Sequence, residues 1–203
     1  MAIVLIVSKT QMKNGVCVGG IIEETCKLIR LHGERGENLP FDVPYEIGDR
    51  WIMSVEKAWN ARPKPHVEDM QTRPHNRINN VGTKGIIQFV QQNSFRMRIA
   101  QGALNNAFDG ALHFEGNKNY IDSSNIPSFS TQFWITDQDL YYREMYGKVY
   151  YRYGNRIIKF VGYQNTIDRI PQGTLIRLSL ANWWDGDGSG EERCYLQLSG
   201  WYL

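Results

Sequence analysis

The chain has 203 residues, of which 42% are hydrophobic and 22% charged, a balance typical of a folded globular protein and not of a disordered one. Its apolar stretches fall short of the roughly 20 residues that span a bilayer. We therefore expect a cytoplasmic protein with no membrane partner. Charge is uneven: 14 Lys and Arg against 10 Asp and Glu give +4 in residues 1–100, whereas 9 against 11 give −2 in residues 101–203. The basic bias of the first half permits binding to a polyanion.

The first part of the chain carries short β elements. Residues 3–7, 16–22 and 26–31 are apolar or alternate with a period of two, which is typical of strands. A polar loop follows, and another strand is expected from residue 51 to about residue 59. Short strands this close together predict a compact barrel.

The middle of the chain changes character. Two prolines within residues 63–69 predict an extended, non-helical segment, and residues 73–80 are polar. Apolar residues then recur near helical spacing in residues 84–90 and again in 99–108. We expect one or two helices over residues 82–108.

The remaining chain predicts strands again. They cover residues 132–135, 148–153, 156–161 and 174–182, and Gly154 with Asn155 forms a two-residue hairpin turn.

The C-terminal segment predicts one more hairpin. Trp183 and Trp184 end a strand, and an acidic, glycine-rich stretch follows at residues 185–191. Its twelfth position is Leu196, not the bidentate Glu of a calcium loop, so we expect a solvated hairpin tip. Residues 194–203 alternate as a half-buried strand. Of the two tryptophans, one is expected in the core and the other toward a ligand or partner.

Several motifs resemble the prokaryotic dual OB-containing domain family. They are IVLIVSK (3–9), GVCVGGI (15–21), LIRL (28–31), YEIGD (45–49), PHVED (65–69) and the closing strand 194–202. The resemblance covers nearly the whole chain. It implies a mainly β (α+β) fold of two consecutive small OB-like β-barrels joined by a helical segment. The expected boundaries are 1–80 for the first barrel, 81–112 for the helical connector and 113–203 for the second barrel.

Barrels of this kind bind single strands with a basic groove and aromatic faces on which bases stack. In a strand, Tyr151 and Tyr153 share one face, whereas Tyr150 and Arg152 share the other. One face must be open for binding; the alternative is core packing for one set and an unpartnered surface for the other. The candidate contacts are aromatic and basic residues, namely Lys9, Lys13, Arg30, Arg62, Lys64, Tyr151, Arg152, Tyr153, Arg156, Trp183 and Trp184.

A polar cluster, His66, Glu68 and Asp69, follows the proline segment. In an extended chain Glu68 and Asp69 point to opposite sides, and no third metal ligand is evident. We expect a structural role in which these side chains bind backbone donors. No metal site and no cofactor are predicted.

The leading hypothesis is a non-catalytic protein that binds nucleic acid, single-stranded DNA or RNA, in a prokaryotic defence or mobile-element system. This setting is what the family resemblance implies. Known nucleophile and phosphate-loop motifs are missing from the sequence. Three alternatives stay open: a protein-interaction module that scaffolds an effector or homodimerises, a nucleotide or small-metabolite sensor, and a metal-dependent hydrolase built on His66, which has the least support.

Overall fold

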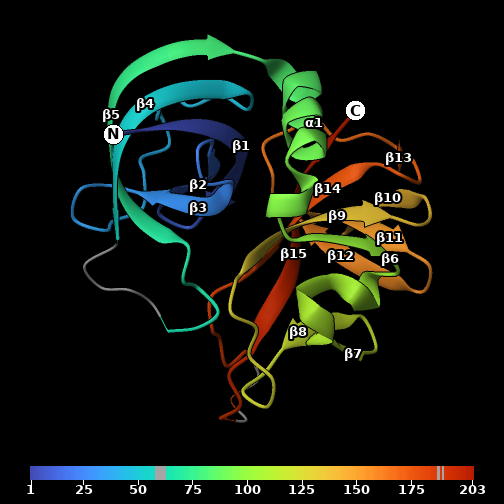
Figure 1. Ribbon diagram of the computed structural model, residues 1–203. Helices are drawn as coiled ribbons and strands as arrows, with labels where there is room; N and C mark the ends of the chain where they lie inside the picture. The colour runs from blue at the N-terminus through green and yellow to red at the C-terminus, as the bar shows by residue number, and fades with distance from the viewer. Residues whose placement is uncertain (58–62, 187, 189) are drawn as a thin grey trace. The chain divides into compact units, whose positions relative to one another are not determined.

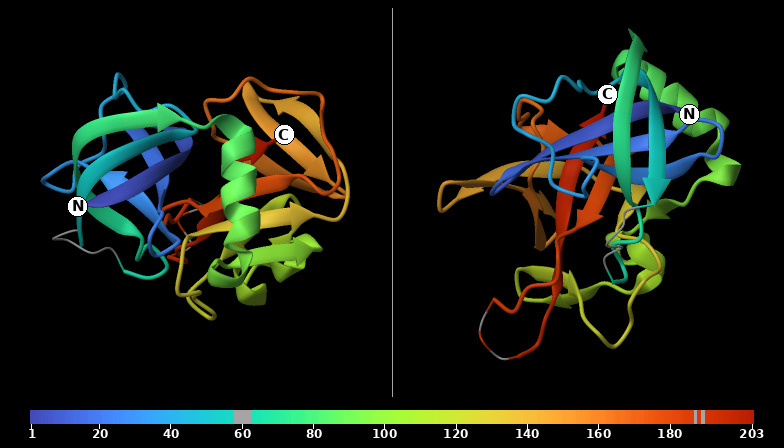
Figure 2. Two further views of the ribbon diagram at one scale, coloured as in Figure 1. Left: turned by 45° about the horizontal axis from the view of Figure 1, so that its top comes forward. Right: turned by 90° about the vertical axis from the view of Figure 1, so that its left-hand side faces the viewer.

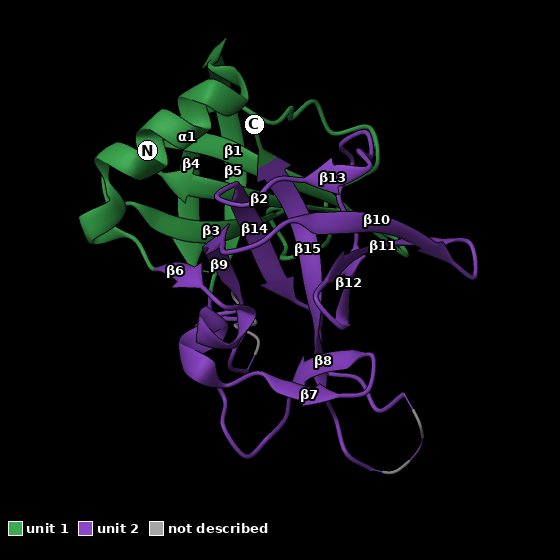
Figure 3. Cartoon of the chain, turned by 90° about the vertical axis from the view of Figure 1, so that its right-hand side faces the viewer, with its two compact units in different colours: residues 1–62, 68–98, 202–203 green, residues 63–67, 99–201 purple. Residues whose placement is uncertain are grey.

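The computed structural model describes residues 1–57, 63–186, 188 and 190–203. The chain divides into two compact units, shown in different colours in Figure 3. Unit 1 comprises Met1–Arg62, Glu68–Arg98 and Tyr202–Leu203, and unit 2 comprises Pro63–Val67 and Ile99–Trp201. Within the described part of the chain, no helix has the length and apolar character needed to cross a membrane.

Unit 1 is a closed barrel of five strands, and their order is β1-β2-β3-β5-β4 (Figure 1). The strands are β1 (Ala2–Met12), β2 (Gly15–Ile22), β3 (Lys27–His32), β4 (Asp49–Lys57) and β5 (Asp69–Asn80). Strand β1 pairs with both β2 and β4, and all pairs are antiparallel except β3 with β5, which is parallel. The apolar positions of the alternating strands fill the barrel core, as the sequence predicted.

Strand β5 was not predicted from the sequence. Both views of Figure 2 show it beside β4, with which it pairs from Met70 to Asn80. From Arg73 to Asn80 every residue is exposed, so this stretch has no apolar stripe. Its position depends on backbone pairing with β4, and two register shifts accommodate extra residues.

The helical prediction is confirmed for its first part only. Helix α1 (Gly82–Gln92) belongs to unit 1 and is followed by a short 3-10 turn, η1 (Ser94–Arg96). The second part, residues 99–108, was predicted wrongly. It forms strand β6 (Ile99–Gly102) and the 3-10 segment η2 (Leu104–Gly110). Burial of Leu104 and Phe108 in the unit 2 core explains the apolar spacing without a continuous helix.

Unit 2 is built on a larger sheet, whose main path is β13-β10-β11-β12-β15-β14-β9-β6. Its remaining strands are β7 (His113–Glu115), β8 (Lys118–Ile121), β9 (Thr131–Thr136), β10 (Leu140–Met145), β11 (Lys148–Tyr153), β12 (Arg156–Phe160), β13 (Arg169–Ile170), β14 (Leu175–Leu180) and β15 (Cys194–Tyr202). The predicted turn at Gly154 is confirmed: its φ is 55°, and Tyr153 pairs with Arg156 across it.

Unit 2 repeats the connectivity of unit 1. Strands β9 and β10 follow one another with only residues 137–139 between them; β9 pairs with β14 and β10 pairs with β11. Together they make the pairings that β1 makes alone in unit 1. The parallel pair β12 and β15 corresponds to β3 and β5. The same five-strand plan is therefore present twice, although no sequence repeat marks it.

Candidate nucleic-acid interface

One face of strands β10, β11 and β12 belongs to the core of unit 2. Tyr151 is fully buried, its ring centroid lies 5.2 Å from that of Trp201, and its hydroxyl donates to the carbonyl of Ile167 at 2.9 Å. Tyr153 is also buried; its ring packs edge-on against another core ring, and its hydroxyl donates to Asp137 at 2.7 Å. These contacts correct the choice of Tyr151 and Tyr153 as stacking residues, because neither ring presents a surface to a base.

The opposite face of the same strands carries cations and tyrosines. The register places Arg143 of β10 opposite Tyr150 of β11, and Tyr150 opposite Lys159 of β12. In Figure 3 these strands lie side by side in unit 2. Next to this row, Tyr141 pairs with Arg152, whose guanidinium carbon lies 5.5 Å from the tyrosine ring centroid. We call this surface the cationic face; its members are Tyr141, Arg143, Lys148, Tyr150, Arg152 and Lys159.

The cationic face holds its charge without neutralising partners. Among the residues that the structure describes, Arg143, Lys148, Arg152 and Lys159 form no ion pair with a carboxylate. Arg152 donates only to a backbone carbonyl, at 3.1 Å. Uncompensated like charges on one surface raise the local potential and attract a polyanion.

The surroundings of Lys159 disfavour its charged form. Burial lowers the pKa of its ammonium group, and the neighbouring charge of Lys148 lowers that pKa further. A lysine whose pKa is lower in the folded than in the unfolded state binds fewer protons when folded. Its unfavourable contribution is present below the lowered pKa and disappears as pH rises through it.

Replacement of Lys159 by Met is therefore expected to leave the free protein equally or more stable at pH 7. Methionine keeps most of the apolar stem but not the charge. Any gain should shrink as pH rises toward about 10, near the ordinary lysine pKa. Urea unfolding at the two pH values measures this, with Lys13→Met, in an exposed turn, as the control. A loss above about 1 kcal/mol at pH 7 would contradict the interpretation.

The basic candidates of unit 1 lie in different surroundings. Arg30 is buried and paired with Asp69 at 2.5 Å, so it is removed from the candidate interface. Lys9 donates to a backbone carbonyl at 3.0 Å and is partly buried. Lys13 is exposed in the β1–β2 turn, and Arg62 lies outside the described residues.

The side chains on the outer face of β2 and β3 are largely buried. Ile29 and Leu31 of β3 point into the barrel core, so Arg30 and His32 alternate outward, yet both are buried. Ile21 of β2 is buried as well. The corresponding face of unit 2 is the cationic face, whose side chains are exposed or partly exposed.

The side chains of the polar cluster, His66, Glu68 and Asp69, are all buried. Asp69, which is 4% exposed, pairs with Arg30 at 2.5 Å and with His32 Nε2 at 3.3 Å. His66 is buried, with Nε2 3.7 Å from the sulfur of Cys194. Within the described ranges, no group of three or more His, Cys, Asp or Glu is arranged to hold a metal ion.

The two tryptophans lie in different surroundings. Trp183 packs against the core, and its indole nitrogen donates to the carbonyl of the exposed Lys64 at 2.8 Å. Trp184 is 59% exposed. The remaining candidate, Arg156, places its guanidinium carbon 3.7 Å from the ring centroid of Phe114, so part of its surface is already occupied.

Unit 1 is a closed five-stranded barrel of order 1-2-3-5-4, and the sheet of unit 2 contains the same order in β10-β11-β12-β15-β14-β9, with the first strand divided into β9 and β10. This strand order defines an OB-fold protein. Proteins of this class bind oligonucleotides on strands 2 and 3 and on the loops between strands 1 and 2 and between strands 4 and 5. In unit 2 these strands are β11 and β12, and the connection from β14 to β15 corresponds to the second of the two loops.

The chain belongs to the dual OB-containing domain family, whose family model matches residues 2–201. This match confirms the resemblance drawn from the sequence motifs and the mainly β fold. No curated protein and no solved structure matched the chain.

Proposed function

We propose that the protein binds single-stranded nucleic acid on the cationic face of unit 2 and catalyses no reaction there. The observation that carries this proposal is a set of four cations that pair with no carboxylate in the described part of the chain. They are interleaved with Tyr141 and Tyr150 on strands that include those that OB barrels use for binding. Phosphates would contact the cations and bases would stack on the tyrosines.

A single strand fits this surface better than a duplex does. Base pairing hides the faces of the bases, so a duplex would use the cations but leave Tyr150 without a stacking partner. A single strand uses both kinds of side chain, because every base has an accessible π face. Stacking on aromatic rings and contacts with phosphates discriminate only weakly between nucleotide sequences.

Fluorescence anisotropy with labelled single-stranded DNA, single-stranded RNA and duplex DNA tests the proposal at low and physiological salt. We expect tighter binding to single strands. The logarithm of the affinity should fall with the logarithm of salt by about 0.7 per phosphate contact. Binding to no single strand at low salt, or equal binding to the duplex, would contradict the proposal.

The variant Tyr150→Ala is expected to weaken binding about 5- to 150-fold, which corresponds to the loss of one stacked base. Tyr150→Phe keeps the ring and should stay close to the wild type. Anisotropy with the preferred strand measures both, and circular dichroism checks that each variant is folded. Equal affinity of the folded Ala variant and the wild type would remove Tyr150 from the site.

A protein-interaction module is the second candidate. Tyr146, in the turn between β10 and β11, is 96% exposed, and an aromatic side chain at such a tip can anchor a partner. Size-exclusion chromatography with light scattering tests self-association. A monomer that binds single strands favours the first function.

The biological setting that we propose is a prokaryotic defence or mobile-element system in the cytoplasm. It rests on the family resemblance alone. Phage and plasmid challenge of cells with and without the protein tests it; equal survival and equal plasmid uptake would argue against this setting while leaving the binding function intact.

A further inference from the structure

A row of four aromatic rings crosses unit 2 beside the cationic face. The His113 and Tyr120 ring centroids lie 5.7 Å apart with the rings nearly parallel, and those of Tyr120 and Tyr195 lie 6.0 Å apart. Trp184 continues the row, 5.9 Å from Tyr195. Arg193 covers the Tyr120 ring at 4.3 Å. We call these four rings the aromatic ladder.

The aromatic ladder and the cationic face share one side of the sheet. Lys159 of β12 pairs with Gln197 of β15 in parallel register, so their side chains point the same way. Tyr195 lies two residues before Gln197 and therefore on the same side, about 7 Å along the strand. The residues between and beside them, Cys194 and Leu196, are buried in the core.

Trp184 is exposed, but its backbone is fixed. Its N–H and carbonyl both bond to Arg193, each at 3.1 Å. The indole lies over Gly186, where a Cβ atom would come within 2.2 Å of the ring. An exposed indole held at the end of a packed row is preorganised for stacking.

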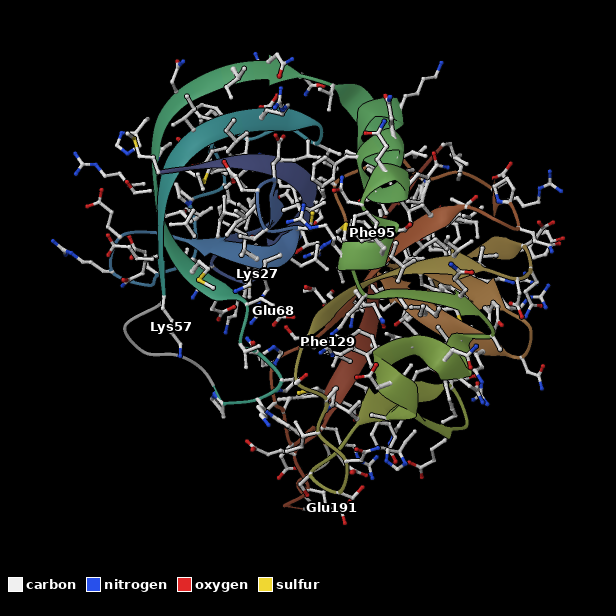
Figure 4. All side chains as sticks on the ribbon, in the orientation of Figure 1. Lys27, Lys57, Glu68, Phe95, Phe129 and Glu191 are labelled. Atoms are coloured by element: carbon white, nitrogen blue, oxygen red, sulfur yellow. The ribbon has the colours of Figure 1, made fainter. Side chains whose placement is uncertain are left out.

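The charges around the aromatic ladder favour a base over a phosphate. Arg193 is paired with Glu115 and with Glu191, each at 3.2 Å, so its charge is compensated. Glu191, labelled in Figure 4, lies with Asp185 and Glu192 in the loop beyond Trp184. Carboxylates there repel phosphates, whereas the flat ring attracts a nucleobase.

We infer that the aromatic ladder is a base-stacking subsite at which the bound strand ends. The strand crosses β11, β12 and β15, with its phosphates on the cationic face and a terminal base on Trp184. This inference rests on the proposed function and extends it, because it gives the ligand a path and an end point.

The test compares Trp184→Ala and Trp184→Phe with the wild type, using a uniform thymidine oligonucleotide and versions with abasic residues at the 5′ or the 3′ end. Trp184→Ala should weaken binding of the full oligonucleotide about tenfold. It should have no effect on the version whose abasic end occupies the ladder. Trp184→Phe should retain most of the affinity. Gly186→Ala should act like Trp184→Ala, because its Cβ displaces the indole.

Three other outcomes would contradict the inference, and they separate a failure of the aromatic ladder from a failure of the proposed function. If the wild type binds the oligonucleotide but Trp184→Ala binds it equally well, the ladder is no subsite and the cationic face stands. If Trp184→Ala loses the same factor on both abasic versions, its effect is structural and the inference fails. If the wild type binds no oligonucleotide, the proposed function fails with it. Matching circular dichroism spectra and urea midpoints establish that all variants are folded.

Discussion

Replacement of Asp69 by Asn is expected to destabilise the protein by about 3–5 kcal/mol. The carboxylate is buried in unit 1, where it pairs with Arg30 at 2.5 Å and lies 3.3 Å from His32. The variant leaves the buried guanidinium without its counter-charge, and the cost of that uncompensated charge dominates. Urea unfolding followed by circular dichroism measures the change.

The control is Glu34→Gln, which removes a surface ion pair of unit 1. The Glu34 and Arg73 side chains are 66% and 70% exposed and lie 3.4 Å apart, so the expected loss is at most about 1 kcal/mol. Joint replacement of Arg30 by Met and Asp69 by Leu should recover part of the stability, because both charges leave together. A loss for Asp69→Asn no larger than for Glu34→Gln would show that the cluster is not structural.

Reversal of two charges on the cationic face is expected to weaken binding to a single strand by about a hundredfold or more at low salt. The double variant Arg143→Glu, Lys159→Glu removes two phosphate contacts and adds repulsion. The slope of log affinity against log salt should become shallower by about 1.4, which is twice the 0.7 expected for each contact. Anisotropy titrations over a salt series measure both quantities.

The matched control changes the same net charge on unit 1. Lys13 and Lys27 are exposed there, and Lys27 is labelled in Figure 4. At physiological salt, Lys13→Glu with Lys27→Glu should leave affinity within about threefold, because neither side chain belongs to the cationic face and salt screens charges that do not contact the ligand. An equal loss in the control variant would mean that net charge, and not the cationic face, determines binding.

The elements that the sequence predicted correctly are those with an apolar pattern. Strands β1, β2 and β3, together with β11, β12, β14 and β15, have buried apolar residues that mark them. Strand β5 lacked this signal, because residues 73–80 are exposed on both faces and polar. Residues 99–108 had apolar residues near helical spacing, but these fill the core of unit 2 from a short strand and a 3-10 segment.

The sequence singled out the strand that carries the candidate site and divided its residues between two faces. Tyr151 and Tyr153 lie on the buried face of that strand. Which face is buried depends on rings from other strands, such as Trp201. One signal was available: a face that carries Arg152 is costly to bury without a partner. Arg143 and Lys159 were missed, because their place beside Tyr150 comes from strand register.

Photo-crosslinking followed by mass spectrometry tests the central claim most directly. A single strand carrying thio-substituted pyrimidines is bound at low salt, irradiated, and its attachment sites are mapped to peptides. We predict attachment on the cationic face, in peptides of β10, β11 and β12, and competition by unlabelled single strand. Attachment confined to peptides of unit 1, or attachment that unlabelled strand does not reduce, would contradict binding at unit 2.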